Sequence, residues 1–253
     1  TAAIKLASKD IINGLHDDSF PLDVFQTGSG TSTNMNANEV IANIAKKKSK
    51  LKINANDDVN MSQSSNDVIP TAICVSALID MNRLLLPNLD ELINSIDLKM
   101  KQVKGNVKTG RTHLMDAMPI DFSQELSGWK AQLEANKKTI TQATNRMNEL
   151  PQGGTAIGTG INAHKDFSKN FCSELNKLSK FNTKPAKNFY QGLSSVDNAV
   201  ELSSALKNLS VILMKISNDL RWMNSGPLTG LGEIELQALQ PGSSIMPGKV
   251  NPV

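Results

Sequence analysis

The chain has 253 residues, of which 39% are hydrophobic and 20% charged, and its formal net charge is +3. This length suffices for one large domain or two modest ones, and the composition is that of an ordinary soluble protein. Aromatic residues make up only 4% and arginines are few, whereas nucleic-acid binding favours clustered arginine and stacking rings. No apolar run approaches membrane-spanning length, and no signal peptide opens the chain. We therefore expect neither a nucleic acid nor a membrane as partner.

The chain opens with a predicted helix and a polar loop. Apolar residues recur at helical spacing from Thr1 to Gly14, where a glycine ends the pattern. From Gln26 to Glu39, two glycines stand among hydroxyl residues that include Ser29 and Thr31. Such a loop can wrap closely around a ligand and offer neutral donors to an anion. The alternative is an ordinary Ser/Thr/Gly linker.

A short helix is expected after this loop. It would run from Glu39 to about Lys46, with Asn36 or Asn38 as its cap. The lysine-rich segment from Lys46 to Lys52 follows. A charge run of this kind is typical of a solvated turn rather than a binding patch.

A second polar loop leads into a long helix. The loop extends from Asn54 to Asp67, and apolar spacing predicts a helix from about Val68 to Val103. Pro70 would fall in its first turn, where a missing N–H costs nothing. Pro87 lies within the pattern and must kink or divide the helix.

Three polar residues stand where this helix begins. Ser64, Ser65 and Asn66 come directly before the apolar pattern. Because the helix macrodipole and the free N–H groups favour negative charge there, we expect an anion at this position.

One histidine lies among other reactive residue types. His113 falls in the stretch from Gly110 to Pro119, for which we predict a turn. The bland alternative is a polar surface histidine, with Arg111 and Asp116 forming a structural ion pair.

The remaining elements are also helical. Long helices are predicted from Phe122 to Leu150 and from Leu193 to Asn224, with a shorter one from Asp166 to Leu178. The glycine-rich loop from Pro151 to Asn162 could cradle phosphate, but it lacks the ending of a P-loop. No β-alternation of useful length is apparent. The fold class is therefore mainly α, a bundle of long helices that partner subunits would extend.

The last loop of the chain carries the most concentrated chemistry. Gly242 to Pro252 contains two glycines and two prolines, which exclude a helix or a central strand. Its polar side chains include the Ser243 hydroxyl, the Lys249 ammonium and the Asn251 amide. Backbone N–H groups beside one ammonium can hold a carboxylate or a developing oxyanion. The alternative is a polar connection without a ligand.

Together the loops concentrate neutral hydrogen-bond donors, one histidine and one lysine. The sequence has no Cys/His cluster at zinc spacing and no nucleotide-binding glycine motif. Neutral donors plus one ammonium suit a small dianion. They favour abstraction of a proton next to a carboxylate, because the resulting negative charge spreads into that carboxylate.

The loop sequences, in their order, resemble class II fumarase of the fumarase/aspartase superfamily. The matching stretches cover essentially the whole chain and include Thr27 to Asn36, Ser62 to Asp67, Gly110 to His113, Gly153 to Gly160 and Gly242 to Pro252. Val253 is the one feature that is more similar to aspartases. The resemblance implies reversible hydration of fumarate to malate without a metal or organic cofactor. The alternatives are an aspartate ammonia-lyase of the same superfamily and a non-catalytic helical assembly protein.

The resemblance also implies a role for each matching residue. Ser243 would remove the proton from C3 of malate as an alkoxide that Lys249 and backbone N–H groups stabilise. His113, directly or through a water, would protonate the departing hydroxide. The residues implied to grip the two carboxylates are Ser29, Thr31, Ser64, Ser65, Asn66, Thr112, Lys249 and Asn251. The implied assembly is a homotetramer whose active sites each draw on three subunits.

Some features depart from the family pattern. Asn54 stands where the secondary dicarboxylate site of the family has a histidine, so that site would be weakened, with Asn56 and Asp57 remaining. We expect residues 1–64 to belong to an N-terminal domain and residues 65–253 to a central helical-bundle domain. The chain has no initiator Met and stops soon after its last motif, so we expect a fragment of a longer protein from the cytoplasm or, alternatively, the mitochondrial matrix.

Overall fold

The computed structural model describes residues 1–246, 248–249 and 251, and it divides into two compact units. Unit 1 consists of Thr1–Arg83 and Ala143–Glu201, and unit 2 consists of Leu84–Gln142 and Leu202–Val253. The predicted domain boundary between residues 64 and 65 stays a prediction.

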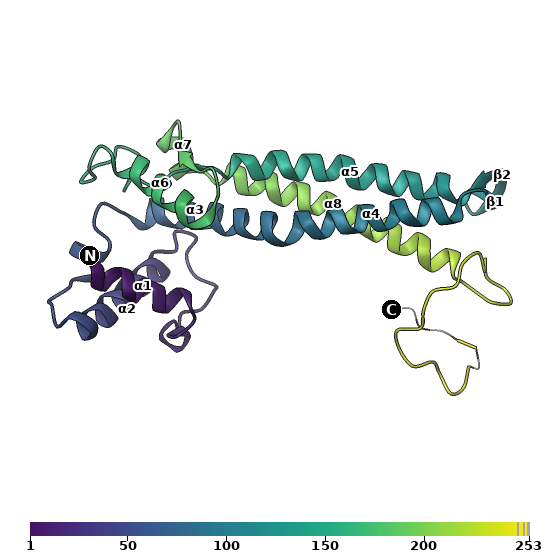
Figure 1. Ribbon diagram of the computed structural model, residues 1–253, viewed down its shortest axis with the longest axis horizontal. Coiled ribbons are helices and arrows are strands. Elements are labelled where there is room, and N and C mark those ends of the chain that lie inside the picture. Colours follow the sequence, from purple (N-terminus) through teal and green to yellow (C-terminus); the bar gives the residue numbers. More distant parts are fainter. Residues whose placement is uncertain (247, 250, 252–253) are drawn as a thin grey trace. The chain divides into compact units, whose positions relative to one another are not determined.

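Unit 2 is built on three long helices that lie side by side (Figure 1). They are α4 (Leu86–Val103), α5 (Phe122–Arg146) and α8 (Asp197–Met223), the last two of which continue into unit 1. Buried apolar residues recur along each helix at three- and four-residue steps, which gives each one an apolar stripe. The largest are Leu89, Ile93, Ile96, Leu126, Trp129, Leu133, Ile140, Leu202, Leu209 and Ile216. The prediction of a mainly α, long-helix fold is confirmed.

The long helix after the second loop has an internal irregularity. It consists of α3 (Ser65–Asp80), a π-helical turn η3 (Met81–Leu85) and α4. The π turn ends two residues before Pro87, so the predicted break is present as a widened turn that accommodates the missing N–H. The predicted start at Val68 was wrong by three residues. Pro70 therefore lies inside α3 rather than in its first turn.

A β-hairpin occupies the stretch for which only a turn was predicted. Strands β1 (Val107–Thr112) and β2 (Met115–Asp121) pair antiparallel, with Val107 opposite Asp121 and Thr112 opposite Met115. The pairing is irregular between Thr109 and Arg111, and a Cβ on Gly110 would lie 2.6 Å from the Met118 carbonyl oxygen. The strands show no apolar alternation because much of the hairpin is exposed. The expectation that the chain lacks strands was therefore wrong.

Unit 1 packs shorter helices. Its helical elements are α1 (Ala2–Ile12), η1 (Asp17–Ser19), α2 (Thr31–Ser49), η2 (Ala55–Val59), α3, α6 (Phe167–Ser179) and α7 (Phe189–Ser194), and strands β3 (Glu149–Leu150) and β4 (Lys184–Pro185) pair in parallel. Ala7, Ala42, Ala45 and Ile53 form one core between α1, α2 and the chain before η2.

Helix α2 is much longer than predicted. It begins at Thr31 after Gly30, not near Glu39, so Asn36 and Asn38 lie inside it and cap nothing. Asn38 is instead buried, and its side chain donates to Asn60 Oδ1 at 3.0 Å. Amides in mid-helix are readily mistaken for caps, because only the fold supplies their distant partners.

The boundaries of the later helices also differ from the predictions. Helix α5 ends at Arg146 rather than Leu150, and the short strand β3 follows it. The predicted helix from Leu193 is divided into α7 and α8 at Ser195 and Val196. Ser195 has extended backbone, which ends α7.

One helical stretch in the described part of the chain, Ser65–Val103, is long and apolar enough by composition to cross a membrane. Its most apolar window has a mean hydropathy of 1.5 and is 22% buried. The expectation that no segment reaches this length was therefore wrong on this criterion. A core helix of a soluble protein satisfies the same criterion, so no membrane association follows.

Candidate active site

The first polar loop carries a row of hydroxyl groups in unit 1. Ser29 Oγ lies 3.1 Å from Thr27 Oγ1 and 3.2 Å from Thr31 Oγ1. Gly30 adopts φ +62°, and a Cβ there would lie 2.8 Å from the Ile69 side chain. Glycine is therefore required for the loop to turn into α2 against α3. This close approach places the hydroxyl row near the start of α3.

The start of α3 is a complete capping box. Ser64 Oγ accepts from the Asn66 N–H at 3.2 Å, and the Asp67 side chain accepts from the Ser64 N–H at 2.9 Å. The Ser64 hydroxyl is thus engaged in the helix cap. Ser65 Oγ accepts from Asn34 Nδ2 at 3.0 Å, and Asn66 Nδ2 donates to the Ala156 carbonyl at 2.7 Å.

Asp67 is the side chain that fixes this helix start. It is fully buried, and its Oδ2 accepts from the Gly153 and Thr155 N–H groups, both at 2.9 Å. Burial raises the pKa of Asp67 above its ordinary value. The hydrogen bonds from the Ser64, Gly153 and Thr155 N–H groups act in the opposite direction, but burial is the larger effect. The Asp67 side chain therefore joins the glycine-rich loop to the start of α3.

A cavity of about 320 Å³ brings three predicted residues together. Ser29, Ser65 and Asn66 line it with the apolar side chains of Ile69 and Ile73. It lies at the N-terminus of α3, where backbone N–H groups and the helix dipole favour an anion. Thr31 joins the site through its contact with Ser29, while Ser64 supports it as the cap.

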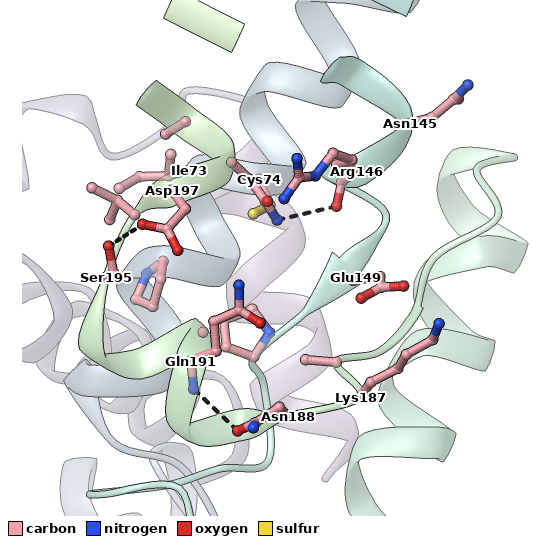
Figure 2. A pocket seen from close by; sticks show the side chains of 17 residues that line it. Ile73, Cys74, Asn145, Arg146, Glu149, Lys187, Asn188, Gln191, Ser195 and Asp197 are labelled. Atoms are coloured by element: carbon pink, nitrogen blue, oxygen red, sulfur yellow. Dashed lines mark hydrogen bonds between the residues drawn. The ribbon is translucent and has the colours of Figure 1, made fainter. Parts of the chain in front are cut away.

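A neighbouring cavity of about 340 Å³ in unit 1 has a different chemistry (Figure 2). Several of its charged side chains are already paired: Arg146 with Glu201 at 2.5 Å, and Glu149 with Lys184 at 3.1 Å. Burial raises the pKa of the Cys74 thiol on its wall to about 11. The thiol is therefore protonated at neutral pH and unsuited to act as a nucleophile.

The residues of the predicted secondary dicarboxylate site lie at η2. Asn54 Oδ1 accepts from the Asn56 N–H at 2.8 Å and from the Asp57 N–H at 3.1 Å. Asn54 thus acts as the cap of this turn, and the side chains of Asn56 and Asp57 are exposed. The site stays a prediction.

The glycine-rich loop braces the fold of unit 1. A Cβ on Gly153 would lie 2.7 Å from Ser168 Cβ, and one on Gly158 would lie 2.8 Å from the Tyr190 ring. Two of the loop N–H groups donate to Asp67. These glycines allow close packing against α6 and α7, which argues against the phosphate cradle considered from the sequence.

His113 lies at the tip of the hairpin in unit 2. It and Leu114 form the two-residue turn between β1 and β2, with φ of 51° and 60°. Both residues adopt the left-handed conformation that such turns require and that non-glycine residues adopt at a cost. Thr112 ends β1 directly before the tip, and both Thr112 and His113 are exposed.

The last loop of unit 2 closes on itself. Asn251 Nδ2 donates to the Pro241 carbonyl at 2.9 Å, and the Asn251 carbonyl accepts from the Gln240 N–H at 3.2 Å. Ser243 Oγ accepts from the Ile245 N–H at 3.3 Å, and the Lys249 N–H donates to the Met246 carbonyl at 3.1 Å. The loop ends are thereby joined, with Ser243 and Lys249 between them. Pro247, Val250, Pro252 and Val253 lie outside the described residues.

The predicted residues fall into two groups. Ser29, Thr31, Ser64, Ser65 and Asn66 belong to unit 1, and Thr112, His113, Ser243, Lys249 and Asn251 belong to unit 2. Of the unit 1 residues, Ser29, Ser65 and Asn66 line one cavity. Within the described part of unit 2, the hairpin tip and the last loop are separate features without a recorded hydrogen bond between them.

Comparison with known proteins identifies the family of the chain. The family model described as lyase matches residues 1–253. The chain belongs to the lyase family. It is 53% identical over 250 residues to a class II fumarate hydratase of Xylella fastidiosa, covering 99% of the chain and 53% of that relative. It is 56% identical over 234 residues to a class II fumarate hydratase of Pseudomonas aeruginosa, covering 92% of the chain and 51% of that relative.

Solved structures agree with these relatives. The chain superposes on the class II fumarase of Schistosoma mansoni with a TM-score of 0.96 at 40% identity, covering 99% of this chain and 57% of that one. The resemblance to class II fumarase predicted from the loop motifs is confirmed. The chain spans about half the length of the curated relatives it matches.

Three side chains that support the candidate site residues were not singled out from the sequence. Asp67 was detectable, because it stands three residues after Ser64 in the spacing of a capping box. Asn34, which supports Ser65 from α2, and Glu233, which pairs with the hairpin, have no local sequence pattern. Their partners are 31 and 122 residues away.

Proposed function

We propose that this lyase carries out the reversible hydration of fumarate to malate. The observation that carries the proposal is the cavity at the start of α3, where Ser29, Ser65 and Asn66 meet in a chain 53% identical to a class II fumarate hydratase. Hydroxyl and amide groups at a helix N-terminus suit a carboxylate without adding a full positive charge.

The proposed chemistry begins with removal of the C3 proton of malate. Ser243 acts as the base, in its alkoxide form, and Lys249 with the N–H groups of the closed loop stabilises that charge. The carbanion spreads its charge into the neighbouring carboxylate. His113 then protonates the departing hydroxide and leaves fumarate. In the reverse direction the same groups add water.

Substrate binding completes the proposal. The residues proposed to hold the two carboxylates are Ser29, Thr31, Ser64, Ser65, Asn66, Thr112, Lys249 and Asn251. Asn54, Asn56 and Asp57 are proposed to form a weakened secondary dicarboxylate site, since Asn54 already caps η2.

The proposed assembly is a homotetramer with active sites shared between three subunits. Two observations support sharing: the groups proposed to act together are divided between the two units, and α8 exposes large apolar side chains. The proposed domains are an N-terminal one within residues 1–64 and a helical-bundle one within residues 65–253. We place the protein in the cytoplasm, as for bacterial enzymes of this kind, with the mitochondrial matrix as the alternative compartment.

Fumarate absorbs in the ultraviolet and malate does not, so loss of absorbance tests the proposal directly. We would assay this chain and a version extended to the length of its curated relatives, each with and without ammonium. Loss of absorbance without ammonium is the expected result. Dependence on ammonium would indicate an ammonia-lyase instead. If neither version is active, the alternative of a non-catalytic helical assembly protein would be favoured.

The role of Ser243 has a direct test in the same assay. Ser243→Ala should abolish turnover, because the loop then offers no hydroxyl at the position of the proposed base. The assembly state of the variant should equal that of the parent, since the Ser243 hydroxyl accepts its hydrogen bond from Ile245 within its own loop. Activity near that of the parent would remove Ser243 from the mechanism.

A further inference from the structure

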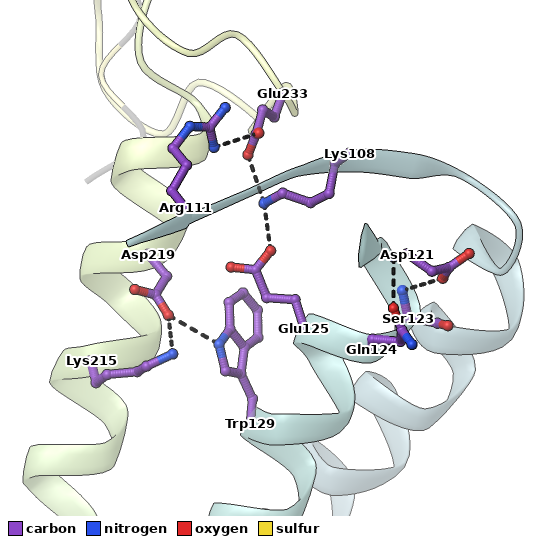
Figure 3. A network of polar contacts seen from close by, with 10 residues as sticks. All are labelled: Lys108, Arg111, Asp121, Ser123, Gln124, Glu125, Trp129, Lys215, Asp219 and Glu233. Carbon is purple, nitrogen blue, oxygen red and sulfur yellow. Dashed lines mark hydrogen bonds and ion pairs between the residues drawn. The ribbon is translucent and has the colours of Figure 1, made fainter. Parts of the chain in front are cut away.

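A buried ion-pair network joins the hairpin of unit 2 to the chain that follows α8 (Figure 3). Glu233 Oε1 lies 2.7 Å from Arg111 Nη1, and Glu233 Oε2 lies 2.8 Å from Lys108 Nζ. Both contacts are ion pairs. The Glu233 side chain is 9% exposed and that of Lys108 only 6%.

The two cations of this network stabilise the charged form of Glu233. Burial would raise the pKa of Glu233, but the Lys108 and Arg111 side chains outweigh it and hold that pKa below its ordinary value. Glu233 is therefore ionised at neutral pH. Lys108 also pairs with Glu125 of α5 at 2.5 Å, so it retains an anionic partner on the bundle side.

Glu233 connects the two segments that carry the proposed catalytic groups of unit 2. Lys108 and Arg111 are in β1, and Arg111 lies two residues before His113. On the other side, the Glu233 N–H donates to the Met223 carbonyl at 2.8 Å, at the end of α8. The chain from Glu233 then leads to Gln240, where the closed loop with Ser243 and Lys249 begins.

The tip of the hairpin needs such support. His113 and Leu114 are non-glycine residues at positive φ, and residues in this conformation persist only when the surroundings hold them. The hairpin itself is largely exposed. The pairs from Lys108 and Arg111 are contacts that fix the strand leading into the tip.

We propose that Glu233 is a positioning residue for this reaction: by pairing with Lys108 and Arg111, it fixes the His113 hairpin to the chain that presents the Ser243 loop. This inference rests on the proposed function. Glu233 itself touches no substrate. It acts by holding the proton-transfer groups of unit 2 in place, and small misplacements of such groups lower rates steeply.

Glu233→Gln is the variant that tests the proposal, with Glu125→Gln as the matched control. Both remove one carboxylate from Lys108, but Glu125→Gln leaves the link between β1 and the chain after α8 intact. In the extended protein, Glu233→Gln should lower kcat by about 10- to 100-fold. Glu125→Gln leaves both Glu233 pairs in place and should change kcat by less than about twofold. Arg111→Lys, which keeps the charge but loses the guanidinium geometry, should give a smaller loss in the same direction.

Two measurements separate positioning from a simple loss of folded protein. With malate deuterated at C3, Glu233→Gln should show a larger deuterium isotope effect than the parent, because a misplaced base makes proton abstraction slower relative to other steps. A smaller fraction of folded enzyme would lower kcat and leave the isotope effect unchanged. That result, or an unchanged kcat, would overturn the proposal.

Hydrogen exchange tests the tether independently of activity. Amides of the hairpin (residues 107–121) and of residues 232–246 should exchange faster in Glu233→Gln than in Glu125→Gln. Equal exchange in the two variants would overturn the tether. If the parent protein does not hydrate fumarate, the proposed function fails, and the exchange comparison still decides whether Glu233 holds these segments together.

Discussion

Asp67 has no exposed surface, and its carboxylate accepts hydrogen bonds from the N–H groups of Ser64, Gly153 and Thr155. Such a group could not itself reach a substrate. Its effect is to fix the backbone of Ser65 and Asn66, which face the cavity. Glu233 has a similar role in unit 2, where it pairs with Arg111 in the strand before His113. In both units a buried carboxylate supports the side chains proposed to act.

The charge of Glu233 makes a prediction about acid stability. Its pKa is lowered in the folded protein, so its pairs stabilise the fold fully above the ordinary value of 4.5 and lose that contribution as the pH falls through the lowered value. The free energy of unfolding of the parent should therefore fall more than that of Glu233→Gln between about pH 6 and about pH 3. Denaturant titrations across this range measure the difference, and parallel pH profiles for the two proteins would contradict it.

The role of the glycine-rich loop depends on where the loop packs in the fold, and its amino-acid composition does not determine that role. The sequence correctly predicted a non-helical segment between Pro151 and Asn162, because its glycines disfavour a helix. Whether those glycines face a ligand or a neighbouring helix depends on packing that no local pattern contains. The structure places Gly153 against Ser168 and Gly158 against Tyr190.

Gly153→Ala should therefore destabilise unit 1. Gly153 has φ +105°, and the added Cβ would lie 2.7 Å from Ser168 Cβ, so a loss of about 1–3 kcal/mol is expected from overpacking, with backbone strain in addition. Gly128→Ala is the control, because Gly128 lies within α5 and a Cβ there meets nothing within 4 Å. That change should raise stability by up to about 1 kcal/mol. Equal midpoints for the two variants in thermal unfolding would contradict this account.

The helices were the most predictable part of the fold, and their boundaries and the hairpin were the least. Apolar spacing located α1, α5, α6 and the composite helix of α3 and α4, because burial of one face imposes that spacing. The hairpin was missed because its strands are mostly exposed, and its tip is His113–Leu114 rather than the Asn-Gly typical of such turns. The start of α2 was missed because Gly30 begins it without a side-chain cap.

At the scale of the whole molecule, α8 exposes large apolar side chains along unit 2. Val211 is 60% exposed, Met214 is 65% exposed and Trp222 is 53% exposed. Large apolar surfaces of this kind are typical of interfaces between subunits. They support the proposed homotetramer.

Substituting both Val211 and Met214 by lysine should disrupt the proposed assembly. Two charges on an apolar interface would have to be buried without partners, which is strongly unfavourable. Sedimentation velocity should then show species smaller than a tetramer, and hydration activity should be lost with them. Asn170→Lys, on the exposed surface of α6, is the control and should leave the assembly unchanged. A variant that remains tetrameric would show that this face of α8 is not an interface.

We propose that the groups of unit 1 and unit 2 act together in a site shared between copies of the chain. The most direct test of this proposal combines two inactive variants. Ser65→Ala with Asn66→Ala removes groups of unit 1, and His113→Asn removes the proposed acid of unit 2. Each variant alone should show little hydration of fumarate.

Co-expression of the two variants in the extended protein is the deciding measurement. If the two groups of each site come from different subunits, random mixing in equal amounts gives about a quarter of sites with both groups intact. Activity should then recover toward about a quarter of that of the parent. If both groups come from the same subunit, no mixed assembly contains an intact site. Mixed assemblies no more active than either variant alone would contradict the account.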